Sequence, residues 1–161
     1  MTDIDDQPNP NSKANTETTD DSILLLDDGD IHVSQDGPRD APALLLVHGS
    51  GASSRSWDPL VPLLTASHHV IRVDLLGCGR SAKPEDGDYR ISRQGHRLGV
   101  ALDRLGIEHA TVVGHSSGGY GATALVERRP ELVTALVLIN SGPSMDAFIA
   151  PPAADIGPSQ W

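Results

Sequence analysis

Apolar and polar positions alternate along the chain in two different periods. Short runs rich in aliphatic and β-branched residues predict strands, and they occupy residues 22–27, 30–34, 43–47, 70–74, 111–113 and 135–140. Between them apolar residues recur at helical spacing, which predicts helices at 57–66 and 91–105 and a third after 116 that ends near 128–130. Because strands then alternate with helices, the sequence predicts an α/β fold with a mostly parallel sheet and helices on both faces.

The first two apolar runs are joined differently from the others. Asp28 and Gly29 lie between them, and this dipeptide favours a tight turn. We therefore expect an N-terminal antiparallel hairpin. The run at 43–47 is apolar without interruption, as a strand buried on both faces requires.

Composition divides the 161 residues into one core and two flanks. Residues 1–21 hold six acids against one lysine, carry half of the formal net charge of −10, and have too little apolar surface to fold. We expect a disordered acidic tail at 1–21 and a folded core at 22–143. Pro, Ala, Gly and Ser dominate 144–161, which we interpret as a tail or the start of a cap segment.

Charge and hydropathy exclude several classes of partner. No basic stripe that would bind nucleic acid occurs, and no apolar run approaches the length of a membrane span. The N-terminus lacks a basic region followed by an apolar one, and the single cysteine, Cys78, excludes an internal disulfide. We therefore expect a cytoplasmic protein that acts on a small-molecule substrate and uses no metal and no cofactor.

The strongest chemical signal is the spacing G-x-S-x-G formed by Gly114, His115, Ser116, Ser117 and Gly118. A strand is predicted before it and a helix after it, so the serine lies on a sharp turn that exposes its hydroxyl. The two glycines let the strand and the helix approach closely. We interpret Ser116 as a nucleophile, and the Ser117 N–H at the start of the helix as a donor to negative charge that forms beside it.

Two further loops follow predicted strands. His48, Gly49, Ser50 and Gly51 come after the run at 43–47, and Asp74 to Ser81 reads D-L-L-G-C-G-R-S. With the G-x-S-x-G turn, these stretches resemble the α/β-hydrolase fold family, in its esterase, haloperoxidase and epoxide-hydrolase-like branch. The resemblance extends over about residues 22–143, which we identify as the N-terminal half of such a hydrolase.

The resemblance implies roles for several residues. Ser50, with Gly51 as second choice, and Ser117 would supply the backbone donors of an oxyanion hole. His48 and Gly49 would support that turn, as Gly114, His115 and Gly118 would support the nucleophile. Within the 74–81 loop we expect Asp74 and Arg80 to brace the turn and Cys78 to be a small buried residue. The strands would lie in the order first, second, fourth, third, fifth, sixth.

The general base is missing at the expected position. In this fold the acid and the histidine follow the serine along the chain, whereas all seven histidines precede Ser116. Without a base a serine hydroxyl is a poor nucleophile, so we expect weak or no hydrolysis by this chain. The family sheet continues past its sixth strand, so we also expect self-association or aggregation through the strand at 135–140, or a need for a complementary C-terminal half.

Two other classes of protein remain open on the residues. A dinucleotide-binding domain would use residues 49–54 as its glycine-rich turn and Asp74 as its ribose ligand. A non-catalytic fragment or binding module would keep the hydrolase core without its chemistry. Among hydrolytic reactions, ester-type acyl transfer is favoured, because epoxide and haloalkane cleavage would prefer an aspartate at Ser116.

Overall fold

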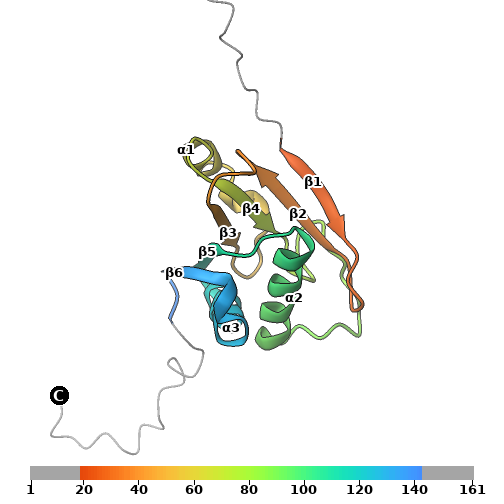
Figure 1. The fold of residues 1–161 in the computed structure, drawn as a ribbon. Coiled ribbons are helices and arrows are strands. Elements are labelled where there is room, and N and C mark those ends of the chain that lie inside the picture. The colour runs from red at the N-terminus through yellow and green to blue at the C-terminus, as the bar shows by residue number, and fades with distance from the viewer. Residues whose placement is uncertain (1–18, 143–161) are drawn as a thin grey trace, which may run out of the picture.

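The computed structural model describes residues 19–142 (Figure 1), so most of the flanks expected at 1–21 and 144–161 lies outside the described residues. The strands form one sheet in the order β1-β2-β4-β3-β5-β6, which confirms the expected order. They are β1 (Asp20–Leu24), β2 (Ile31–Asp36), β3 (Ala43–Val47), β4 (His69–Val73), β5 (Ala110–His115) and β6 (Val133–Ile139). The helices are α1 (Val61–Leu64), α2 (Ile91–Arg104) and α3 (Ser117–Arg128), with 3₁₀ turns η1 (Ser54–Trp57) and η2 (Pro130–Leu132).

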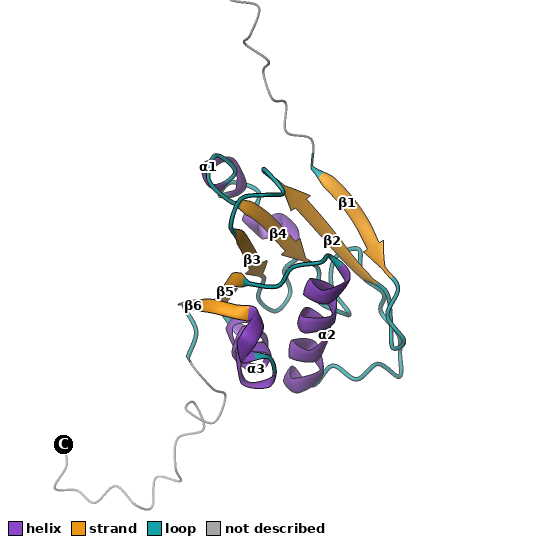
Figure 2. Cartoon of the chain, viewed as in Figure 1, coloured by secondary structure: helices purple, strands orange, loops and turns teal. Residues whose placement is uncertain are grey.

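The sheet is mixed, as the fold class requires. β1 pairs antiparallel with β2 and β2 with β4, whereas β3, β4, β5 and β6 are mutually parallel. Alternate residues of β3 point to opposite faces, so Leu44 and Leu46 pack with Trp57 and Val61 on one face. Leu45 and Val47 belong to the cluster on the other face, which α2 and α3 cover (Figure 2).

The predicted helix at 57–66 is wrong as a single element. The chain forms η1, a turn, and then the short helix α1. Pro59 would lie in the first turn, where an N–H has no partner in the helix, but Pro62 cannot donate to the Asp58 carbonyl, so the ladder of a helix over 57–66 is interrupted there. The apolar residues of this segment nevertheless pack against the sheet, where Trp57 and Val61 are both buried.

The boundary of the acidic tail is also corrected. Asp20 and Asp21 belong to β1, where they pair with Gln35 and Ser34 of β2. The Asp21 carboxylate accepts a hydrogen bond of 2.7 Å from the Ser34 hydroxyl, which lowers the pKa of Asp21. Composition could not find this start, because pairing with a neighbouring strand orders the backbone whatever the side-chain polarity.

β6 forms one edge of the sheet within residues 19–142. Its residues Val137 and Ile139 are 43% and 38% exposed, and the strand contains no charge and no proline. The Ile139 carbonyl accepts from the Ser116 N–H, so residues 137 and 139 turn their backbone groups to β5. Leu136 and Leu138 therefore direct theirs outward, where an added strand would pair. None of the helices in this range is long and apolar enough to cross a membrane.

We expect the chain to self-associate through this edge, and Val137→Lys to reduce that association, because a charge on an edge strand opposes strand addition. Light scattering over a concentration series measures the association. The matched control is Leu63→Lys, which places a lysine at an apolar side chain of α1 that is 76% exposed. A wild-type monomer whose Leu136 and Leu138 amides resist hydrogen exchange would contradict the prediction, because another segment would then cover the edge.

Candidate active site

Three loops meet at the carboxyl ends of β3, β4 and β5. These three strands are parallel neighbours in the sheet, so their carboxyl ends lie at the same edge. Contact between the first and the third loop is direct: the Ser50 and Ser117 hydroxyls are 2.8 Å apart, although 67 residues separate them in sequence. The tertiary structure therefore brings together the segments that the sequence singled out separately.

Ser116 lies at the turn between β5 and α3. Its backbone has φ 53° and ψ −126°, a conformation that side chains with a Cβ rarely adopt and that costs about 1–3 kcal/mol. Two hydrogen bonds of 2.9 Å hold it there: the Ser116 N–H donates to the Ile139 carbonyl, and its carbonyl accepts from the Gly119 N–H. The residue is exposed, so the strained turn presents its side chain to solvent.

The glycines around Ser116 are explained by close backbone approaches. A Cβ at Gly118 would lie 2.2 Å from the His48 carbonyl oxygen, and one at Gly114 would lie 2.5 Å from the Gly119 Cα. A Cβ at Gly49 would lie 3.1 Å from the Ser116 Cβ. These distances are shorter than real Cβ contacts allow, or at their limit, so β3, β5 and α3 can converge here only without side chains.

The two histidines next to these turns have other partners. His48 is buried, its Nδ1 lies 2.8 Å from the Gly49 carbonyl, and its Nε2 accepts from the Leu75 N–H at 3.0 Å. These contacts require the neutral ring with the proton on Nδ1, and they join the loop after β3 to the loop after β4. The His115 ring packs edge-on against Trp57, with ring centroids 6.4 Å apart.

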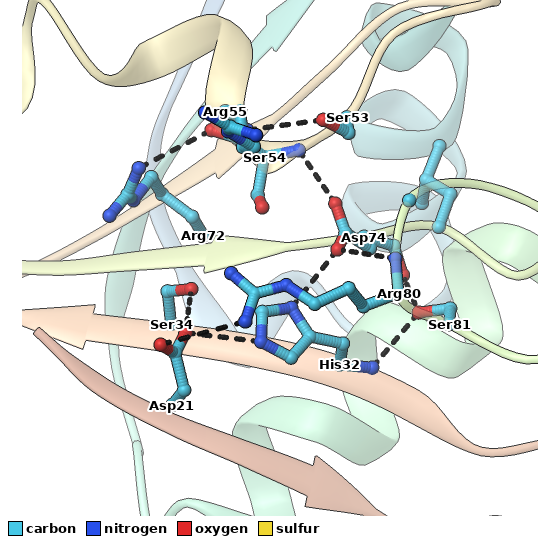
Figure 3. A network of polar contacts seen from close by, with 12 residues as sticks. Asp21, His32, Ser34, Ser53, Ser54, Arg55, Arg72, Asp74, Arg80 and Ser81 are labelled. Carbon is cyan, nitrogen blue, oxygen red and sulfur yellow. Dashed lines mark hydrogen bonds and ion pairs between the residues drawn. The ribbon is translucent and has the colours of Figure 1, made fainter.

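Asp74 holds the loops after β3 and β4 in place (Figure 3). Its Oδ1 accepts from the Ser54 N–H at 2.6 Å, and its Oδ2 accepts from the Arg80 N–H and lies beside His32 Nδ1, both at 3.0 Å. Burial acts to raise the pKa of Asp74, but the backbone hydrogen bonds from Ser54 and Arg80 outweigh it and hold the pKa below its ordinary value. The carboxylate is therefore a charged anchor of this end of the sheet.

The same contacts contradict the dinucleotide-binding alternative. Asp74 is 1% exposed, and its oxygens are already engaged by Ser54, Arg80 and His32, so it cannot reach a ribose. The glycine-rich turn at 49–54 leads into η1 rather than into a long helix, so it lacks the helix N-terminus that binds a pyrophosphate. Arg80 braces the loop through its backbone, while its guanidinium lies 3.7 Å from Asp21.

A cavity of about 350 Å³ lies beside Ser50 and Ser117. Its walls come from the loop after β3, the loop after β4, and the first turns of α2 and α3. Cys78 lines this cavity and is half-buried, so its expected role as a small buried residue is wrong. Burial, together with the charge of Asp74, raises the pKa of the Cys78 thiol, which is therefore protonated at neutral pH.

Side chains that the sequence did not single out also line this cavity. Lys83 and Tyr89 come from the long loop after β4, and Gln94 comes from α2. The Tyr89 ring occupies the space above Gly77 and Gly87, where added Cβ atoms would lie 2.7 Å from it. The two glycines were the sequence signal that could have indicated a packed side chain in this loop. Within residues 19–142 no group of three or more His, Cys, Asp or Glu side chains is arranged to hold a metal ion.

The strand order and the three loops define a class of α/β protein in which a strained strand–helix turn lies at the carboxyl ends of parallel strands. The model of the alpha/beta hydrolase fold family matches residues 42–161, and the chain belongs to this family. This confirms the resemblance of the motifs.

Particular relatives are longer than this chain. It is 44% identical over 102 residues to 2-hydroxymuconate semialdehyde hydrolase of Pseudomonas sp. (strain CF600), a match that covers 61% of this chain and 36% of that protein. It resembles a hydrolase from Pseudomonas aeruginosa PA01 (TM-score 0.72, 32% identity), covering 75% of this chain and 46% of that one. It also resembles a haloalkane dehalogenase variant from Bradyrhizobium elkanii, with a TM-score of 0.70 and 34% identity. That match covers 76% of this chain and 40% of that one. The chain spans less than half the length of each relative.

Proposed function

We propose that this chain carries the nucleophile and the oxyanion hole of a serine hydrolase that cleaves ester-type acyl bonds of a small molecule. Ser116 is the nucleophile, and the backbone N–H groups of Ser50 and Ser117 bind the oxyanion. The observation that carries the proposal is the strained, exposed backbone of Ser116 at the β5–α3 turn. Such strain persists only where the surrounding structure holds the backbone in place, and strained residues cluster at active sites.

The oxyanion hole is supported by the contact between the two loops. The first N–H groups of a helix have no partner within the helix, so the Ser117 N–H is available at the start of α3. The hydroxyls of Ser50 and Ser117 are 2.8 Å apart, which keeps the loop after β3 next to that helix start. Removing one such donor from a serine hydrolase costs about 2.7–4 kcal/mol of transition-state stabilisation.

The proposed reaction has two acyl transfers. The Ser116 Oγ attacks the carbonyl carbon and loses its proton to a base, and the carbonyl oxygen becomes an anion bound by the two N–H groups. Collapse of this intermediate breaks the ester C–O bond, and the alcohol leaves with the proton. Water then attacks the acylated Ser116 in the same way and releases the carboxylic acid.

Within residues 19–142, the two histidines next to these turns both have other partners. His48 is held by Gly49 and Leu75, and His115 packs against Trp57. Serine hydrolases that lack triad members keep about 10³–10⁴-fold of rate over water. We therefore expect the chain by itself to hydrolyse activated esters weakly.

Added imidazole is expected to restore part of the missing step. With p-nitrophenyl acetate as substrate, the chain and imidazole together should release p-nitrophenol faster than the sum of either alone, because imidazole replaces the base. Ser116→Ala should abolish this excess. Ser92→Ala, which removes another exposed hydroxyl, should leave it unchanged. An equal excess in the Ser116→Ala chain would refute the nucleophile.

A further inference from the structure

The cavity beside Ser50 and Ser117 has apolar walls and one charged side chain. Leu75, Leu76 and Ile91 line it, and among the lining residues only Lys83 is charged. No carboxylate lines it, although the whole chain carries a formal net charge of −10. Lys83 is therefore the one charged side chain of the lining, while the Asp74 carboxylate lies outside the lining and its charge reaches Cys78.

Backbone carbonyls hold the Lys83 ammonium in position. Its Nζ donates to the Gly79 carbonyl at 2.6 Å and to the Ser81 carbonyl at 3.2 Å. An ammonium has three donors, so one remains for a ligand. The loop segment that supplies these carbonyls is itself anchored on Asp74. The Arg80 N–H donates to the Asp74 carboxylate, and the Ser81 hydroxyl donates to the Asp74 backbone carbonyl. The position of the ammonium is thus fixed by the braced loop as well as by its flexible stem.

Two other polar side chains of the lining, Gln94 and Tyr89, are engaged by protein groups. Gln94 Oε1 accepts from Arg97 Nη1 at 3.2 Å, and Gln94 Nε2 donates to the Leu76 carbonyl at 3.0 Å. Arg97 is held in turn by the Asp28 carboxylate at 2.8 Å. The amide orientation is therefore set, with its oxygen used by Arg97 and one amide hydrogen left over. The Tyr89 hydroxyl donates to the Pro84 carbonyl.

We infer that this cavity binds a substrate whose acyl group ends in a carboxylate, with Lys83 as the residue that selects it. This deepens the proposed function and rests on it: the ester carbonyl lies at the N–H groups of Ser50 and Ser117, an apolar stretch contacts Leu75 and Ile91, and the carboxylate reaches the Lys83 ammonium. The substrate class is that of half-esters of aliphatic dicarboxylic acids. A charged hydrogen bond between carboxylate and ammonium is stronger than a neutral one.

A pair of ligands of equal length tests the inference by binding alone. Monomethyl glutarate ends in a carboxylate, and methyl valerate has a methyl group in its place. In the Ser116→Ala chain, which cannot be acylated there, backbone amide shifts of Ser50 and Cys78 report binding by NMR titration. We expect the anionic ligand to bind about fivefold more tightly, the upper range for an exposed ion pair, and the difference to shrink as salt is added.

Substitutions at Lys83 separate charge from structure. Lys83→Gln should remove the preference for monomethyl glutarate, and Lys83→Arg should keep it. Arg55→Gln, which removes a cation that does not line the cavity, should leave it unchanged. Equal binding of the two ligands, or a preference that survives in Lys83→Gln, would overturn the inference.

The result of this binding test does not depend on whether Ser116 is the nucleophile, so the failure of either proposal can be told from the failure of the other. If the preference is found but the imidazole experiment fails, the carboxylate subsite stands and the serine mechanism falls. If Ser116-dependent hydrolysis is found but neither ligand is preferred, the subsite is refuted and the mechanism stands. A series from malonate to adipate half-esters then gives the span between the oxyanion hole and Lys83, as the length at which the preference is largest.

Discussion

Replacing Gly118 with alanine is expected to destabilise the fold by about 3 kcal/mol, the upper end of the usual cost of overpacking. The new Cβ would lie 2.2 Å from the His48 carbonyl oxygen and 2.6 Å from the Val47 carbonyl oxygen. Both obstacles are backbone atoms of β3 and its following loop, so no side chain can turn aside. The start of α3 must move away from the sheet, and the Ser117 N–H moves with it.

A second glycine of the same helix provides the matched control. A Cβ at Gly121 would meet only the Leu98 Cδ1, at 3.9 Å, which is an ordinary contact. In a helix interior alanine is favoured over glycine by about 0.5–1 kcal/mol, so Gly121→Ala should stabilise the chain. Urea unfolding followed by circular dichroism measures both variants. Equal stability of Gly118→Ala and the wild type would show that α3 does not pack on β3 as closely as described.

Replacing Asp74 with asparagine is expected to cost about 3–5 kcal/mol, as breaking a buried charged contact does. The change keeps the size of the side chain but turns one acceptor oxygen into an NH₂ group. That group would face either the Ser54 N–H or the donors of Arg80 and His32. Asp86→Asn, at an exposed aspartate outside this network, should change stability little.

The pH dependence gives this prediction a direction. The folded chain holds the pKa of Asp74 below its ordinary value, so the unfolded chain binds the proton more readily. The stabilisation is therefore fully present above the unfolded pKa of about 3.9 and is lost as the pH falls through the folded pKa. The stability difference between wild type and Asp74→Asn should stay constant near neutral pH and shrink in acid. A difference that grows in acid would contradict this assignment.

Local sequence determined most of the secondary structure and the turn that carries Ser116. The continuous run at 43–47 is a strand with those bounds, and the helix expected at 91–105 ends one residue earlier. The strand–turn–helix at Ser116 was readable because small residues at fixed offsets are a local requirement of that turn. The strand order was predicted from resemblance to a family, because the sequence of one strand does not specify which other strands pair with it.

Only the tertiary structure decided which side chains meet at the carboxyl ends of the strands. The contact between His32 and Asp74 joins residues 42 positions apart. Asp28 holds Arg97 across 69 positions, and Arg97 in turn orients Gln94. Lys83 and Tyr89 lie in a loop whose sequence is polar and predicts no site, yet both line the cavity. Gly77 and Gly87 leave the room that the Tyr89 ring occupies. Periodicity and motifs report the local backbone, whereas burial, ion pairing and cavity walls depend on how the sheet brings distant loops together.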